Sequence, residues 1–142
     1  MVQLPLRYNP PIVSTRTPPP AAFFPLAIVL VLLGVGGLFL IFSFALPTLG
    51  PRWLFFFLIV CALTGIALPL TAFLNYRFPS SPPATQNVIV RQALWVGIYG
   101  TTLAWLQYGR VFNSSLAVIL FAGFFAIEML LRLWERSQFR KE

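Results

Sequence analysis

The sequence predicts an all-α, polytopic membrane protein with four transmembrane helices that form two antiparallel hairpins. Composition is the first reason: of 142 residues, 58% are hydrophobic and only 9% are charged, whereas a soluble domain carries roughly 25% charged residues. Patterning is the second, because the apolar residues gather in long runs close to the roughly 20 residues that cross a bilayer. Lipid is therefore the expected solvent for most of the surface.

Four apolar runs divide the chain, separated by turn-forming segments. The predicted spans are residues 21–46, 53–76, 88–108 and 112–133, which together make a transmembrane domain over residues 21–133. The remaining segments are a Pro-rich tail over residues 1–20, a polar loop over residues 77–87 and a basic tail over residues 134–142. Proline at the density of the first tail excludes helix and favours an extended segment. Beyond the membrane, the last helix is expected to continue through residues 134–138.

The third predicted span is the least apolar of the four. Its hydrophobic part, residues 93–106, contains two glycines and two adjacent threonines. Only by adding residues 88–92 and 107–108 does a helix reach about 31 Å at 1.5 Å per residue, the thickness of the hydrocarbon layer. Arg91 would then have to extend its side chain to the lipid headgroups.

Small residues recur at helical spacing within the predicted spans. In lipid, such residues let two helix backbones approach closely. They predict packing faces on the first three helices. The residues concerned are Gly34, Gly37, Gly65, Ala93, Gly97 and Thr101.

Positive charge predicts the orientation. With four spans, both tails and the middle loop lie on one side of the membrane. That side carries eight basic residues: Arg7, Arg16, Arg77, Arg91, Arg132, Arg136, Arg140 and Lys141. The other side carries two, Arg52 and Arg110. Because cytoplasmic segments are enriched in Lys and Arg, both termini are expected in the cytoplasm, in a multi-pass protein of the cell inner (plasma) membrane.

The side chains needed for catalysis are nearly absent. The chain has no His, no Asp and a single cysteine, Cys61. Serine and threonine hydroxyls therefore have no evident base to activate them, and no Cys/His cluster has metal-ligand spacing. The net charge of +7 comes from single basic residues between apolar runs, which is not the basic stripe of a nucleic-acid binder. We expect no enzyme, no nucleic acid, and no catalytic, cofactor or metal residues.

Glu128 is the one acidic residue predicted within a span, and such a residue is a functional candidate by default. Arg132 lies four residues later on the same helical face, in the order that favours an ion pair. The pattern therefore predicts an interfacial salt bridge. A proton or cation site at Glu128 and an ion pair from this residue to a partner subunit are the alternatives.

The last third of the chain carries a resemblance to a known kind of protein. Residues 90–97 (VRQALWVG), 104–107 (AWLQ) and 110–113 (RVFN) resemble an uncharacterised family of small four-helix bacterial membrane proteins. The resemblance implies a bacterial inner membrane and no assigned activity.

The expected function follows from two observations: the sequence lacks the side chains that catalysis needs, and its small residues predict faces for helix packing. The leading hypothesis is a non-catalytic structural or accessory subunit of a larger bacterial membrane protein complex, such as an energy-transducing one (respiratory or photosynthetic). Its expected partners are the lipid bilayer and other membrane-protein subunits. The alternatives are a small oligomeric ion-coupled transporter with Glu128 as the coupling residue, and a membrane-resident regulator or assembly factor.

Overall fold

The computed structural model of the chain is all-α and describes residues 17–44, 49–80 and 83–139. A short 3-10 helix leads into the first of four α-helices. The elements are η1 (Pro20–Phe23), α1 (Phe24–Phe44), α2 (Leu49–Arg77), α3 (Gln86–Tyr108) and α4 (Ser114–Phe139). Most of the predicted Pro-rich tail, residues 1–16, and the end of the basic tail, residues 140–142, lie outside the described residues.

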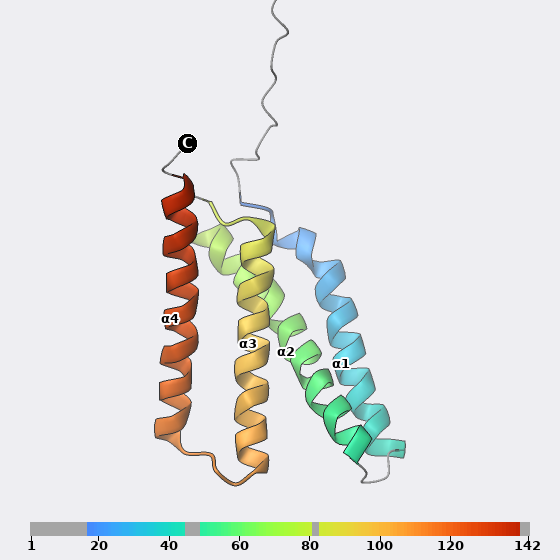
Figure 1. Ribbon diagram of the computed structural model, residues 1–142. Coiled ribbons are helices and arrows are strands. Elements are labelled where there is room, and N and C mark those ends of the chain that lie inside the picture. Colours follow the sequence, from blue (N-terminus) through green and yellow to red (C-terminus); the bar gives the residue numbers. More distant parts are fainter. Residues whose placement is uncertain (1–16, 45–48, 81–82, 140–142) are drawn as a thin grey trace, which may run out of the picture.

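The four helices stand side by side in chain order, each antiparallel to the one before it (Figure 1). Among the described residues, α1 packs on α2, α2 on α3 and α3 on α4. Helices α1 and α4 do not pack on each other, so the row does not close into a four-helix bundle. One end of the row holds the start of α1, the α2–α3 loop and the end of α4, and the other holds the α3–α4 turn (Figure 1).

Helices α1 and α2 pack closely because glycines on each helix face the other. A Cβ atom added at Gly34 would lie 2.6 Å from Cα of Ala62, and one at Gly37 would lie 2.6 Å from a Leu58 methyl carbon. Gly65 of α2 faces Val31 of α1 in the same way, with 2.8 Å to the Val31 backbone nitrogen. These three glycines therefore lie on the α1–α2 interface, where a side chain would push the backbones apart.

The α2–α3 contact is also built on small residues. A Cβ atom at Gly97 would meet the Thr64 hydroxyl and would lie 3.0 Å from the Val60 carbonyl oxygen. Ala93 is fully buried. The hydroxyl of Thr101 donates to the Gly97 carbonyl oxygen at 2.8 Å. The buried apolar cluster joins η1 and the start of α1 to α2, the α2–α3 loop and α3, and consists of Phe23, Ala27, Ala67, Leu68, Ala72, Ala84, Ile89 and Ala93.

The α3–α4 contact differs from the other two. Helix α3 packs far more closely against α2 than against α4. Large aromatic side chains separate α3 from α4: the ring centroid of Phe124 lies 5.3 Å from that of Trp95 and 6.0 Å from that of Tyr99. Helix α2 therefore packs closely against both α1 and α3, whereas α4 is only loosely packed, so the two hairpins are not equivalent.

A tight turn joins α3 to α4, with Arg110 in the left-handed region at a φ of 56°. The backbone N–H of Val111 donates to the Leu106 carbonyl oxygen, and that of Arg110 donates to the Gln107 carbonyl oxygen. This is the Schellman pattern, in which glycine usually occupies the left-handed position. Helix α4 then begins at an N-cap, because the Asn113 side chain accepts from the Ser115 N–H at 3.2 Å.

Within the described ranges, three helical segments are long and apolar enough to cross a membrane: Pro20–Phe44, Arg52–Arg77 and Ser114–Ser137, whose most apolar stretches have mean hydropathies of 2.8, 2.4 and 2.2. They suggest a membrane location. The predicted third span, residues 88–108, is helical within α3 but does not belong to this group. Arg91 and Gln92 near its start, and the two glycines and two threonines further along, lower its mean hydropathy. Helix α4 runs on to Phe139, in agreement with the expected extension beyond residue 133.

Candidate functional site

Polar side chains from three helices meet near the end of the row that holds the α2–α3 loop. They come from α2, α3 and α4, and all are partly shielded from solvent. We call this set the polar cluster. It consists of Asn75, Arg91, Gln92, Glu128, Arg132 and Glu135.

Glu128 lies at the centre of the polar cluster, with a side chain only 16% exposed. Its Oε2 accepts from Nε of Arg91 at 3.2 Å. Its Oε1 accepts from Nε of Arg132 at 3.3 Å and from Nε2 of Gln92 at 3.3 Å. Two cations and one amide therefore bind this carboxylate, which is how a charged group is kept inside a membrane protein.

Arg91 of α3 holds two glutamates of α4 at once. Besides Glu128, it binds Glu135, with 2.6 Å from Nη1 to Oε1 and 3.4 Å from Nη2 to Oε2. Glu128 and Glu135 lie seven residues apart, two turns along one face of the helix. The planar guanidinium, with five N–H donors in a fork, suits this double role better than an ammonium group would.

Asn75 links the cluster to α2. Its Nδ2 donates to Oε1 of Gln92 at 2.7 Å and to the Thr71 carbonyl oxygen at 2.8 Å. Its Oδ1 accepts from Nη2 of Arg132 at 3.5 Å. The hydrogen bonds thus close a ring through Asn75, Gln92, Glu128 and Arg132, and this ring connects three helices.

The charges within the polar cluster balance. Two arginines face two glutamates, and the carboxylate of Glu128 already has three donor residues. Within the described ranges, no group of three or more His, Cys, Asp or Glu residues could hold a metal ion. Cys61 lies apart on α2, buried at 7% exposure. The arrangement is therefore suited to fastening α4 to its neighbours.

The sequence prediction and the structure can be compared residue by residue. Glu128 and Arg132 lie together, with 3.3 Å between Oε1 and Nε. Arg91 was expected to extend to the lipid headgroups; in the structure its guanidinium turns toward α4 and binds both glutamates. Sequence reasoning did not find the hydrogen bond between Asn75 and Gln92. A signal for the missed ion pair exists: Arg91 precedes Arg110 of the turn by 19 residues and Glu128 follows it by 18, so an antiparallel hairpin places both at one height.

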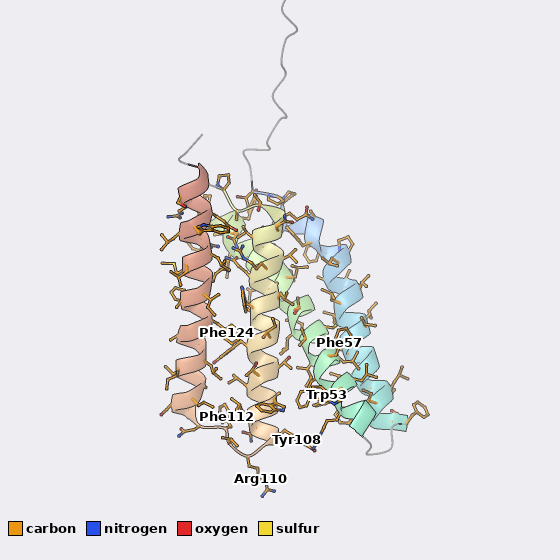
Figure 2. All side chains as sticks on the ribbon, in the orientation of Figure 1. Trp53, Phe57, Tyr108, Arg110, Phe112 and Phe124 are labelled. Atoms are coloured by element: carbon orange, nitrogen blue, oxygen red, sulfur yellow. The ribbon has the colours of Figure 1, made fainter. Side chains whose placement is uncertain are left out.

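Below the polar cluster, aromatic side chains fill the space between α3 and α4. Phe124 of α4 points across toward α3 (Figure 2). Tyr99 packs against Phe121 at 5.9 Å between ring centroids, and its hydroxyl donates to the Ala117 carbonyl oxygen at 3.1 Å. A cavity of about 170 Å³ remains among these rings, with Gln92 and Glu128 at one end.

Comparison with known proteins adds no relative. No protein-family model, no curated protein and no solved structure matches this chain. The resemblance of the last third to a bacterial membrane-protein family stays a prediction.

Proposed function

We propose that the chain is a four-span inner-membrane protein, with both termini in the cytoplasm, that serves as a non-catalytic accessory subunit of a larger bacterial membrane complex. The observation that supports the subunit role is that the carboxylate of Glu128 already accepts hydrogen bonds from three side chains of this protein. A carrier residue must be free to exchange its proton or ion, whereas this carboxylate is held by Arg91, Arg132 and Gln92.

Chain connectivity supports a membrane crossing by α3. Helix α2 ends where α3 begins, and α3 ends at the opposite end of the row, where α4 begins (Figure 1). If α2 and α4 both cross the bilayer, the chain between them must cross as well. The 23 residues of α3 extend over about 34 Å at 1.5 Å per residue, enough for a hydrocarbon layer of about 30 Å. Neutralisation of Arg91 by two glutamates lowers the cost of placing it at membrane depth.

The distribution of arginines supports the orientation. Arg110 projects from the α3–α4 turn, at the end of the row opposite the α2–α3 loop (Figure 2). The loop end carries four of the described basic residues, Arg77, Arg91, Arg132 and Arg136. By the positive-inside rule, the loop end faces the cytoplasm. Trp53, Tyr108 and Phe112 gather near the opposite end (Figure 2), as aromatic residues do at a membrane–water interface.

The open row supports an assembly role. The most apolar stretch of α4 has no buried residue, and only 11% of the corresponding stretch of α1 is buried. Each of these helices packs on a single neighbouring α-helix in the described part of the chain. Both outer helices thus offer long apolar faces to lipid or to another subunit.

Native purification tests the proposal. The tagged chain is extracted from its own membrane in mild detergent and its mass is measured by native electrophoresis and mass spectrometry. Co-migration with a defined set of other membrane subunits supports the accessory role, and a respiratory or photosynthetic set would give it an energy-transducing context. A species containing only copies of this chain would contradict it.

A substitution at the cluster tests the transporter alternative. Glu128→Gln removes the carboxylate and keeps an amide that can accept from Arg91. Under the subunit proposal, transport in proteoliposomes is the same for the variant and the unchanged protein. A transport activity that Glu128→Gln abolishes, while the helical content is retained, would favour a carrier.

A further inference from the structure

A groove with polar and apolar ends lies between α2 and α3, away from the polar cluster. Two adjoining cavities of about 370 Å³ each form it, and both are lined by Trp53, Phe56 and Trp105. The outer cavity reaches Arg52 and Tyr108, at the end of the row that holds the α3–α4 turn. The inner cavity reaches Val60 and Thr101, toward the middle of the helices. We call the two together the α2–α3 groove.

Arg52 is held in place at the mouth of this groove. Its Nη2 donates to the Tyr108 hydroxyl at 2.6 Å, and its guanidinium carbon lies 4.8 Å from the centroid of the Tyr108 ring. The side chains of the described glutamates, Glu128 and Glu135, bind Arg91 at the opposite end of the row. Among the residues that the structure describes, Arg52 therefore has no carboxylate partner. Its remaining N–H groups can bind a phosphate, whose geometry matches the guanidinium fork.

The depth of the groove matches one leaflet. Arg52 and Val60 are eight residues apart on α2, which is about 12 Å at 1.5 Å per residue. Half of the hydrocarbon thickness is about 15 Å. A chain that starts at the level of Arg52 and follows the groove therefore ends close to the bilayer midplane. The walls along this path are aromatic and aliphatic apart from Thr101 and Thr102, whose hydroxyls donate to carbonyl oxygens of their own helix.

We propose that the α2–α3 groove is a binding site for an anionic phospholipid, with the phosphodiester on Arg52 and one acyl chain between Trp53 and Trp105. The charge selects the headgroup, because a zwitterionic lipid brings its own cation to a site that already has one. The length and apolar walls select an acyl chain over a soluble phosphate. This site requires that α2 cross the membrane, and it does not depend on the accessory-subunit role.

Native mass spectrometry of the full chain in detergent tests the site. Phosphatidylglycerol and phosphatidylcholine with identical acyl chains are added in equal amounts, and the ratio of bound species is measured. We expect phosphatidylglycerol to predominate by about tenfold. Both lipids can place a phosphodiester on Arg52, but phosphatidylcholine also brings a quaternary ammonium cation, which is repelled by the guanidinium. Arg52→Gln should bring the ratio close to one. The matched control is Arg110→Gln, which removes an equal charge at the same end from a side chain that projects away from the protein (Figure 2).

A second variant tests the acyl-chain path. Thr102→Phe fills the inner cavity from a position outside the packing face of Ala93, Gly97 and Thr101, and it loses a hydroxyl bond to Ile98 of its own helix. It should reduce phosphatidylglycerol binding about tenfold while glycerol 3-phosphate, which has no acyl chain, binds neither protein. Equal ratios for Arg52→Gln and Arg110→Gln would overturn the proposal. Binding of glycerol 3-phosphate as tight as that of the lipid would also overturn it. So would a dimer of this chain that Arg52→Gln dissociates and Arg110→Gln does not, because a second copy would then occupy the groove.

Discussion

Replacing Arg91 by glutamine tests whether the polar cluster fastens α4. The guanidinium makes four N···O contacts with two carboxylates, at 2.6, 3.2, 3.4 and 3.4 Å. The Arg91 side chain is 27% exposed, and those of Glu128 and Glu135 are 16% and 36% exposed. The variant leaves one arginine facing two glutamates, so the cluster carries an uncompensated negative charge.

The expected cost lies between two limits. An exposed ion pair contributes about 0–1 kcal/mol, and removing one partner of a fully buried pair costs about 3–5 kcal/mol. For a cluster that is roughly a quarter exposed, we expect Arg91→Gln to lower the free energy of unfolding by about 2 kcal/mol. The double variant Arg91→Gln with Glu135→Gln restores charge balance, and we expect a coupling energy of about 1 kcal/mol, the size found for polar contacts in membranes.

Equilibrium unfolding in mixed micelles with increasing denaturing detergent measures these values. With Trp53, Trp105 and Trp134 replaced by Phe, the fluorescence of Trp95, whose ring centroid lies 5.3 Å from that of Phe124, reports on the separation of α3 and α4. Arg136→Gln is the matched control: the side chain is exposed on α4 and makes no ion pair among the described residues. Equal stability of Arg91→Gln and Arg136→Gln would refute the fastening role, and so would a coupling energy indistinguishable from zero.

Three further predictions use other parts of the chain. Gly34→Ala should destabilise the protein by about 2 kcal/mol through overpacking, because its Cβ would lie 2.6 Å from Cα of Ala62. Gly36→Ala, on the same helix with open space around it, should be neutral or stabilising by up to about 1 kcal/mol; equal losses in thermal melting would contradict the α1–α2 interface. Arg110→Gly should raise the free energy of unfolding by about 1 kcal/mol, because glycine adopts a positive φ without the steric cost; a loss would show that the arginine is needed in the turn. Cys61, 7% exposed, should resist a membrane-permeant maleimide until the protein is denatured, and rapid labelling of the folded chain would contradict its burial.

Sequence reasoning failed where the helices offered no distinct face. Helices α1 and α2 are apolar nearly all round, so periodicity does not say which side meets a neighbour. Glycines indicated contact surfaces but not partners: Gly34 and Gly36 read alike in sequence, yet one faces Ala62 and the other faces open space. On α3, Gly97 faces α2 and allows a close approach, whereas the ring of Trp95 faces Phe124 of α4 and keeps that helix further away.

The sequence by itself determined the helical class and the approximate ends of the four helices. It also determined that three of them are apolar enough to cross a membrane. These are local properties: a run of apolar residues has an unfavourable transfer to water whatever lies beside it, and proline, Asn113 and the α3–α4 turn act within a few residues. Tertiary structure alone decided that the helices form an open row and that Arg91 binds Glu128 and Glu135. Those contacts depend on the rotation and height of each helix relative to its neighbour, which are settled by how side chains fit together across the interface.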